Sequence, residues 1–555
     1  MTTPDLGKPD FPTDMPDTIG PYFRKRAAQY AARPFLASPP DPDRIWHPGG
    51  FNLSFDQAAL EVTRIRHALR ASGYGHGHRV AVLLGNRPEM LLWKLALAEL
   101  GISWVPVNPD YRPAETAYLL NDCAADLALS TPELADQMAQ GIVECGRDLA
   151  LAMMQDAALP QAATPAPISG PVTPACEASL IYTSGTTGRP KGCILSHQYE
   201  LLMGEWYAGQ GGLIDFGPDG ERVYCPLPLF HVNAAILLFF AVISTGSTQI
   251  IPDRFSARAW WSDIIATRAT VAHYLGIIIP ALMKQPPGPL DRAHGIKWAV
   301  GAGVEPTLHR AFEDRFGCPL IEVWGMTEMC RILGDTDEPR QIDTRSIGRA
   351  RPGLEVRVVG DDDAELPRGV PGEMVLRHSA GAPRRGAFSG YLNLPEATQE
   401  AWRGGWFHTG DTVTMDQSGT IFFVDRRKNI VRRSGENIAA AEVEACLLAH
   451  DDVIQVAVIA VPDALRDEEV MACVVVRPGQ GPDGQPGADL ARRLFDHAMD
   501  KITYYKAPGW IVFVDNLPVT GTQKIQKHAI FGPGQDPCAD PQAHDLRAFK
   551  KRPVT

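Results

Sequence analysis

The residues most able to do chemistry begin with TSGTTGRPKG, residues 183–192, a segment rich in glycine and hydroxyl groups. Such a segment can cradle phosphates, because glycine lets backbone N–H groups approach an anion and lysine adds positive charge. A Walker loop needs Gly-Lys and then Ser or Thr, beginning five residues after its first glycine. Here that position is Pro190, and Lys191 is followed by Gly192, so the spacing excludes a Walker loop. A phosphate loop of another kind and an ordinary Gly-rich surface loop stay open.

Four further segments combine carboxylates, hydroxyls, lysines and a large aromatic ring. Carboxylate oxygens suit Mg²⁺, hydroxyls and amides suit phosphate and ribose, and lysine suits a developing negative charge. Taken singly, each segment is weak, because a Glu and a Trp at a strand end are more often a surface charge and a core ring. The segments are VWGMTE (323–328), GWFHTGD (405–411), DRRKNIVRRSGENI (425–438) and LPVTGTQKIQK (517–527).

The elements that must position these residues alternate between strands and helices. Residues 79–109 place a helix-period stretch between two apolar runs, which predicts a strand–helix–strand unit. Residues 156–175 are crowded with Pro, Ala and Thr and predict a surface connector. Further alternation up to about residue 353 predicts an α/β fold with largely parallel sheets. Short strands and turns follow, and a second, α+β unit begins near Asp425.

Composition narrows the functional classes. A chain of 555 residues with 45% hydrophobic and 21% charged residues predicts two or more globular domains, and no apolar run is long enough for a membrane span. The first residues lack a signal-peptide pattern, and ten cysteines without a CxxC pair indicate reduced thiols, so we expect a cytoplasmic enzyme. A net charge of −12 argues against nucleic-acid binding. The basic ending RAFKKRPVT predicts a solvated tail.

The five segments, in this order, resemble the adenylate-forming superfamily, which includes acyl- and aryl-CoA synthetases, luciferases and the adenylation domains of peptide synthetases. The likeness covers roughly residues 20–530, and SARAWWSDIIATRATV, FVDRRKN and LRDEEV are most similar to the crotonobetaine/carnitine–CoA ligase subfamily. It implies a large N-terminal domain over residues 1–424 and a hinge at 425–428. It also implies a small mobile C-terminal domain over 429–535, leaving 536–555 as a tail.

The resemblance implies a reaction in two steps. A carboxylate attacks the α-phosphate of ATP to give an acyl-adenylate and pyrophosphate, and the thiol of CoA then takes the acyl group and releases AMP. The first step brings anions together, so the site needs Mg²⁺, N–H donors and a mobile cation. The implied cofactors and substrates are therefore ATP, Mg²⁺, coenzyme A and a small-molecule carboxylic acid.

Matching positions carry the family's roles. Lys524 is the adenylation lysine, Thr327 contacts the α-phosphate, Glu328 and Thr187 bind Mg²⁺, and His231 is a gate or pocket residue. Lys428 is the hinge residue. The nucleotide and CoA contacts fall on small, hydroxyl, aromatic or charged residues: Thr183, Ser184, Gly185, Thr186, Thr187, Gly188, Lys191, Gly301, Ala302, Gly303, Trp324, Gly325, Asp411, Arg426, Lys428, Gly435 and Glu436. Three positions depart from the family pattern: Gln523, Ala440 and Asn429.

The sequence constrains the acyl acceptor and the identity of the carboxylic acid less than it constrains the nucleotide site. His231 stands where amino-acid-activating relatives commonly have Asp, and no carrier segment follows, which favours a carboxylate–CoA ligase over an enzyme that loads a separate carrier protein. A catalytically silent nucleotide-binding module is the third alternative, and a homodimer is compatible with each. The acyl pocket is expected at residues 231–233, 273–277 and the Gly301 segment, whose mixed lining predicts a small or medium polar acid. A carnitine-like acid would need a receptor for its ammonium, with candidates Tyr274, Trp206, Tyr207 and Glu205.

Overall fold

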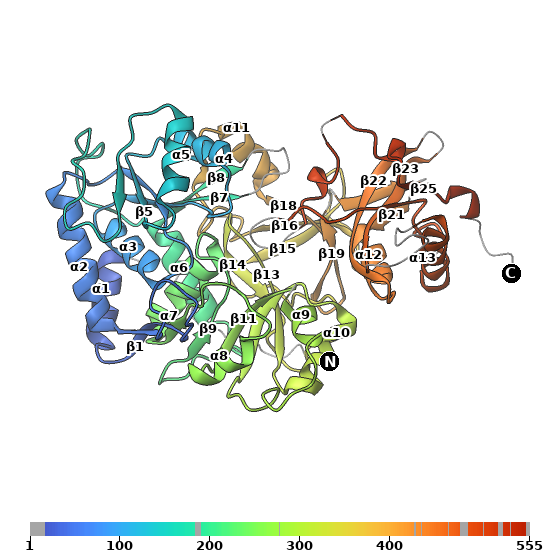
Figure 1. Ribbon diagram of the computed structural model, residues 1–555, viewed down its shortest axis with the longest axis horizontal. Helices are drawn as coiled ribbons and strands as arrows, with labels where there is room; N and C mark the ends of the chain where they lie inside the picture. Colours follow the sequence, from blue (N-terminus) through green and yellow to red (C-terminus); the bar gives the residue numbers. More distant parts are fainter. Residues whose placement is uncertain are drawn as a thin grey trace. The chain divides into compact units, whose positions relative to one another are not determined.

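The computed structural model divides the chain into two compact units, which are described separately (Figure 1). Unit 1 comprises Met1–Val356 and Leu376–Phe407, and unit 2 comprises Arg357–Val375 and His408–Thr555. Within the described ranges, no helix is long and apolar enough to cross a membrane. The described residues are 17–183, 190–276, 278–426, 429–433, 436–463, 466–477, 487–502, 504–519, 525–532 and 534–550.

A seven-stranded sheet in unit 1 has the order β17-β8-β7-β4-β3-β5-β6. Strands β3 to β7 pair in parallel, and β8 and β17 add antiparallel neighbours at one edge. The predicted strand–helix–strand unit is confirmed as β3, α3 and β4, and residues 156–175 form no helix or strand. The elements are β3 (Arg79–Leu83), α3 (Pro88–Glu99), β4 (Ser103–Pro106), α4 (Pro113–Asp122), β5 (Leu127–Ser130), α5 (Ala135–Cys145), β6 (Leu151–Met153), β7 (Glu177–Thr183), β8 (Lys191–Ser196) and β17 (Gly390–Tyr391).

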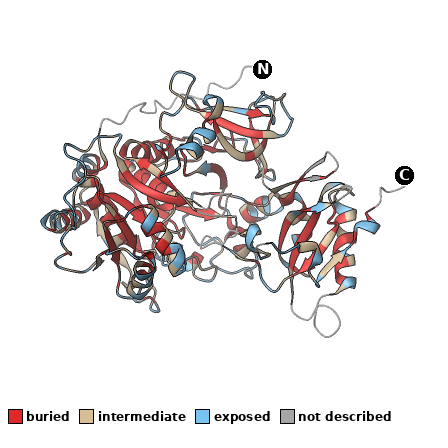
Figure 2. Cartoon of the chain, turned by 90° about the horizontal axis from the view of Figure 1, so that it is seen from above, coloured by how far each residue is buried: buried red, intermediate tan, exposed pale blue. Residues whose placement is uncertain are grey.

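An eight-stranded sheet, also in unit 1, has the order β14-β13-β12-β11-β9-β10-β1-β2. Its inner pairs are parallel, and only β2 and β14 join antiparallel, so the predicted parallel-rich α/β class is confirmed. Its strands are largely buried (Figure 2). They are β1 (Pro34–Ser38), β2 (Phe51–Ser54), β9 (Arg222–Tyr224), β10 (Thr248–Ile250), β11 (Val271–Leu275), β12 (Trp298–Ala302), β13 (Leu320–Met326) and β14 (Met329–Gly334).

Helices follow the strands of unit 1 and end where the local sequence requires. In α10, Pro306 fixes the first helical φ, and Gly317 takes the left-handed conformation that closes the last turn, with φ of 70°. The remaining helices of unit 1 are α1 (Ile19–Gln29), α2 (Phe55–Ala71), α6 (His197–Ala208), the π-helix η1 (Asn233–Leu238), α7 (Phe239–Thr245), α8 (Trp260–Ala266), α9 (Ile278–Met283), α10 (Pro306–Phe316) and α11 (Pro395–Ala401).

Unit 2 contains a six-stranded sheet, which packs against two helices, and most of a four-stranded sheet. Strands β15, β16 and β18 of the four-stranded sheet each include residues assigned to unit 1. This arrangement confirms the predicted α+β character. The elements are β15 (Glu355–Val359), β16 (Gly372–Arg377), β18 (Phe407–Met415), β19 (Ile421–Arg426), β20 (Ile430–Arg433), β21 (Glu436–Ala439), α12 (Ala440–Leu448), β22 (Val453–Asp463), β23 (Asp467–Val476), α13 (Ala488–Lys501), β24 (Trp510–Phe513) and β25 (Ala543–Asp545).

The predicted hinge lies beside a described contact inside unit 2. Asp425 at the end of β19 accepts hydrogen bonds from the Ala441 amide at 2.9 Å and the Asn429 side chain at 3.1 Å. These bonds tie the end of β19 to the first turn of α12. Lys428 itself lies outside the described residues, and the boundaries 1–424, 425–428 and 429–535 stay predictions.

Residues 536–550 are not the solvated tail that the sequence suggested. Strand β25 pairs with β24, and the Lys550 ammonium lies 2.5 Å from a Glu469 carboxylate oxygen. Glu469 also accepts from Arg433 at 2.8 Å, and all three side chains are buried. Burial lowers the pKa of Lys550 to about 8. The basic sequence at the end of the chain did not indicate the ion pair between Lys550 and Glu469, because Glu469 lies 81 residues before Lys550.

Removing residues 536–555 should therefore destabilise the protein. The deletion strips β24 of its partner and leaves the Glu469–Arg433 pair without its second cation, and disrupting such buried groups typically costs about 3–5 kcal/mol. We expect a lower midpoint in urea or thermal unfolding monitored by circular dichroism.

Deleting only residues 551–555 is the matched control, because it removes none of the contacts just described. Equal midpoints for the two deletions would contradict the proposed structural role of β25 and Lys550.

Candidate active site

The glycine-rich segment connects two antiparallel strands rather than a strand and a helix. Thr183 on β7 and Lys191 on β8 are register partners, so residues 184–190 close a β-hairpin. A Walker loop instead leads into a helix, whose N-terminus receives phosphate. Ser184, Gly185, Thr186, Thr187 and Gly188 lie outside the described residues, and their phosphate contacts stay predictions.

Thr327 and Glu328 occupy the tight turn between β13 and β14, where Met326 and Met329 are register partners. Both residues are buried, and Glu328 is 7% exposed. The Thr327 carbonyl accepts from the Tyr199 hydroxyl at 2.8 Å. The Glu328 carbonyl accepts from the Phe388 amide at 2.9 Å, so backbone contacts fix the turn on both sides.

Tyr391 joins this turn to the glycine-rich segment. Its hydroxyl donates to a Glu328 carboxylate oxygen at 2.8 Å, and the Lys191 ammonium lies 5.0 Å from its ring centroid. Burial, reinforced by the Glu328 carboxylate, raises the pKa of Tyr391, so the hydroxyl stays a donor. Two segments 137 residues apart in sequence therefore share one tyrosine. Sequence reasoning missed Tyr391, which stands outside the five motifs.

The Gly301 segment ends β12 at a point of very close backbone approach. A Cβ at Gly301 would lie 2.3 Å from the Tyr274 carbonyl oxygen, and Gly303 has φ of 87°. A Cβ at Gly276 would lie 2.3 Å from the Gly303 carbonyl oxygen. Only glycine fits these places, as expected for a segment that must lie close to a ligand.

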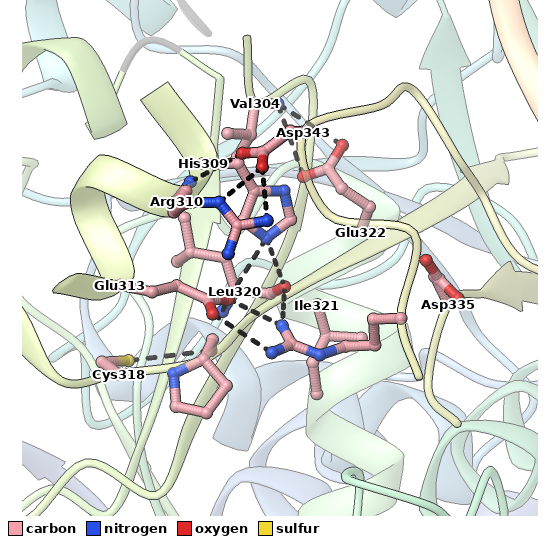
Figure 3. Close-up of polar contacts among 12 residues, drawn as sticks. Val304, His309, Arg310, Glu313, Cys318, Leu320, Ile321, Glu322, Asp335 and Asp343 are labelled. Carbon is pink, nitrogen blue, oxygen red and sulfur yellow. Dashed lines mark hydrogen bonds and ion pairs between the residues drawn. The ribbon is translucent and has the colours of Figure 1, made fainter. Parts of the chain in front are cut away.

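Glu322, a residue the sequence did not single out, holds this segment in place. Its carboxylate accepts from the Gly303 amide at 2.9 Å and from the Tyr274 hydroxyl at 2.7 Å. The Val304 amide lies 3.4 Å from the same carboxylate (Figure 3). Burial raises the pKa of Glu322 to about 7. The carboxyl group therefore changes charge near neutral pH while it orients the Gly303 amide.

A second carboxylate, that of Glu313, fixes the start of β13, the strand that carries Glu322. Glu313 on α10 accepts from the Leu320 amide at 2.8 Å and from Arg340 at 2.7 Å, and the His309 ring contacts the Leu320 carbonyl at 3.1 Å (Figure 3). Strand β13 is thereby anchored to α10 at its beginning, and its far end carries Trp324. The Trp324 side chain is buried, next to the exposed Gly325, and its adenine contact stays a prediction.

The predicted acyl-pocket residues divide into partly exposed and buried groups. His231, Val232 and Asn233 are partly exposed, and burial lowers the pKa of His231 to about 4, which keeps its ring neutral at pH 7. His273 is 0% exposed, with one ring nitrogen 2.9 Å from Asn233 Oδ1 and the other 2.8 Å from the Tyr207 hydroxyl. Both ring nitrogens of His273 therefore already have protein partners, and the place of residues 273–277 in the acyl pocket stays a prediction.

The four side chains suggested for an ammonium group are likewise engaged. Tyr274 donates to Glu322, and Tyr207 bonds to His273. Trp206 donates from its indole nitrogen to the Ile332 carbonyl at 2.9 Å, and Glu205 accepts from Tyr22 and Ser244. None of these contacts requires a ligand.

In unit 2, the predicted ribose-binding residues are neighbours across a strand pair. Asp411 on β18 and Arg426 on β19, which the family resemblance assigns to the ribose hydroxyls of ATP, are register partners, and their ribose contacts stay predictions. Glu373 shapes the preceding turn, because it accepts from the Gly410 amide at 3.0 Å and contacts His408 at 3.1 Å. Sequence reasoning also missed Glu373, which lies far from every motif.

Several predicted residues of unit 2 remain untested. Lys428, Gly435 and Lys524 lie outside the described residues, and Glu436 is described only as part of β21, opposite Arg433. Their roles in the hinge, the thiol path and adenylation stay predictions.

Comparison with known families gives two matches in the expected order. Residues 23–392 match the AMP-binding enzyme family, and residues 442–524 match the AMP-binding enzyme C-terminal domain. The sequence is 32% identical over 521 residues to a sulfoacetate–CoA ligase of Cupriavidus necator, covering 92% of this chain and 97% of the relative. It is 30% identical over 497 residues to a crotonobetaine/carnitine–CoA ligase of Escherichia fergusonii, covering 86% and 92%.

Solved structures show the same fold. The anthranilate–CoA ligase AuaEII in complex with anthranoyl-AMP superposes with a TM-score of 0.77 at 23% identity, covering 95% of this chain and 98% of that one. ATP-bound MatB from Rhodopseudomonas palustris gives a TM-score of 0.75 at 23% identity, covering 92% and 98%. The chain therefore belongs to the AMP-binding enzyme family, in its acyl-CoA synthetase branch.

Proposed function

We propose that this acyl-CoA synthetase activates a short polar carboxylic acid with ATP and transfers the acyl group to coenzyme A. The observation that carries the proposal is the position of Tyr391, whose hydroxyl bonds to Glu328 at the turn between β13 and β14 and whose ring lies near Lys191 of the glycine-rich segment. Relatives that match over most of the chain are CoA ligases, which favours CoA over a carrier protein as acceptor. Homodimer formation and a cytoplasmic location stay predictions.

The residues present fit a divalent cation that works with a nucleotide. Glu328 supplies a buried carboxylate, a hard oxygen ligand, and the Tyr391 hydroxyl fixes its orientation from one side. Mg²⁺ at such sites typically takes one or two carboxylates together with substrate phosphates, and it would neutralise the charge that builds up on those phosphates. Lys191 adds a cation, and Thr327 offers a hydroxyl donor at the turn between β13 and β14. The carboxylate oxygen of the acid then bonds to the α-phosphorus as the bond to pyrophosphate breaks.

The size and charge of the acid follow from the engaged side chains and the relatives. Sulfoacetate and crotonobetaine or carnitine, named for two relatives, are all short and polar, which supports a small acid. The Arg331 guanidinium already lies 5.5 Å from the centroid of the Trp206 ring and would repel a second cation there, so we favour a short acid without a quaternary ammonium.

The proposal is tested by measuring pyrophosphate and AMP release with a panel of acids, with and without CoA. Short polar acids should give CoA-dependent AMP formation and should outperform palmitate. ADP as the nucleotide product, or a preference for palmitate, would contradict the proposal.

Glu328→Gln should lower kcat by about tenfold or more, equivalent to about 1.4 kcal/mol of barrier, because it removes the charge that faces the metal. Asp411→Ala should have a similar effect through the ribose. Tyr391→Phe keeps the Glu328 charge and should cost less than Glu328→Gln. Initial rates over a Mg²⁺ titration measure these effects, and parental kinetics in Glu328→Gln would exclude Glu328 from the site.

The two half-reactions should depend on different residues of unit 2. Lys524→Ala should abolish pyrophosphate release, measured with hydroxylamine trapping, but spare CoA attack on a supplied acyl-adenylate. Gly435→Leu should do the reverse, because a side chain there would crowd the thiol path, and Lys428→Pro should impair the thiol step more than adenylation. If a variant that melts normally slowed both steps equally, the result would argue against a mechanism in which the small domain takes one orientation for adenylation and another for thiol attack.

Glu322→Gln should flatten the pH dependence of stability. The folded-state pKa of Glu322, about 7, lies above the ordinary value of 4.5, so its favourable contribution is present below pH 4.5 and is lost as pH rises through 7. The melting temperature of the parent should therefore fall relative to Glu322→Gln between pH 5 and pH 8. Parallel melting curves across that range would show that Glu322 does not titrate there.

A further inference from the structure

Arg331 on β14 is a buried cation without a carboxylate partner. It lies three residues after Glu328 and is 4% exposed. Its guanidinium donates to the Arg385 carbonyl and lies 5.5 Å from the Trp206 ring centroid. No carboxylate of the described chain lies within 4.0 Å of it. Burying a charge without a counter-charge is costly, so such a cation points to an anion supplied from outside the chain.

Two other buried cations, Lys94 and Arg433, have the carboxylate partners that Arg331 lacks, whereas Arg87, also 4% exposed, has no carboxylate of the described chain within 4.0 Å either. Lys94 pairs with Glu200 at 2.9 Å, and Arg433 pairs with Glu469 at 2.8 Å. Arg44 lacks such a pair but donates to three backbone carbonyls, whereas Arg331 donates to one. The guanidinium carries five N–H donors, and those that do not bond to the Arg385 carbonyl are open to solvent or to a ligand, since none of its nitrogens is both enclosed and without a partner.

The absence of a side chain at Gly386 leaves room for the Arg331 guanidinium. Gly386 has φ of 70°, and a Cβ there would lie 2.5 Å from Arg331 Nη1. Burial, together with the charges of Arg331 and Arg385, lowers the pKa of the neighbouring His378. The region is therefore one of positive potential, and it is enclosed by β14, Trp206 of α6 and the segment that contains Gly386.

Arg331 also lies at a suitable distance from the predicted reaction centre. Three residues of extended strand separate its Cα from that of Glu328 by about 10 Å. Trp206, which packs against Arg331, precedes Tyr207, and Tyr207 bonds to His273, next to the partly exposed Asn233. The last turn of α6 thus connects Arg331 with the predicted acyl side.

We propose that Arg331 binds a second anionic group at the far end of the acid, so that the substrate is a short carboxylate bearing a sulfonate or another carboxylate. This inference rests on the proposed function, since it names the substrate class of the same site. A planar guanidinium suits both groups, because it can donate two parallel N–H bonds to a pair of oxygens. It would repel a quaternary ammonium.

Three acids that differ mainly in charge test the proposal on the parental enzyme. They are sulfoacetate, methylsulfonylacetate, in which a methyl group replaces the charged oxygen, and trimethylammonioacetate. CoA-dependent AMP formation should give a kcat/KM at least tenfold higher for sulfoacetate than for the neutral analogue, and lowest for the cation. Malonate and succinate, compared with propionate and butyrate, decide whether a second carboxylate serves as well as a sulfonate.

Arg331→Gln should raise KM for the dianionic acid at least tenfold, change KM for its neutral analogue little, and leave KM for ATP and CoA unchanged. Arg384→Gln is the matched control, because it removes the same charge from an exposed residue two positions before Gly386. Arg331→Lys keeps the charge, so it should keep the order of preference if Arg331→Gln fails to fold.

The possible results distinguish a failure of the proposed function from a failure of the anion subsite alone. If no acid supports AMP release, the proposed function fails, and the anion subsite fails with it. If neutral acids react as well as dianionic ones, the enzyme is a ligase but the subsite is wrong. A rise in KM for CoA instead of the acid in Arg331→Gln would likewise overturn the proposal, because the guanidinium would then serve a CoA phosphate.

Discussion

The hydrogen bond from the Tyr391 hydroxyl to Glu328 is the interaction on which the site in unit 1 depends. Glu328 sits at the turn between β13 and β14 of the eight-stranded sheet, and Tyr391 belongs to β17 at the edge of the seven-stranded sheet. Because β17 pairs with β8, which begins at Lys191, this one contact links two segments of different sheets for which phosphate binding is predicted. The two sheets must pack in one relative position for the motifs to meet.

Two buried glutamates near this turn show how surroundings separate the roles of identical groups. Glu322 accepts only from backbone amides and a tyrosine, and burial raises the pKa of its carboxyl to about 7, so its task is to hold the Gly303 segment. Glu328, six residues later, sits at a turn beside a lysine-bearing strand, which suits a metal ligand. The difference arises from partners and not from residue type.

Sequence reasoning was strongest where local pattern and fixed motif order coincide. It predicted the parallel-rich sheets, the connector at residues 156–175 and the α+β unit, because periodicity and turn residues encode these directly. It did not find Tyr391, Glu322, Glu373 or Arg331, because their roles arise from contacts between distant segments that no local spacing encodes. The partners of His273 were hidden for the same reason: a histidine on a strand gives no sign of the groups that will occupy both its ring nitrogens.

The pairing of residues 543–550 within unit 2 bears on how the chain folds during synthesis. Domains usually fold in order as they emerge from the ribosome, so unit 1 can form while the rest of the chain is still being made. Strand β24 and Glu469, in contrast, have to wait for β25 and Lys550 before their pairing is complete. Over that interval β24 presents an open edge, which other chains could join. Aggregation during synthesis would thus originate in unit 2, and slow translation of the residues between β24 and Lys550 would lengthen the interval in which that edge is open.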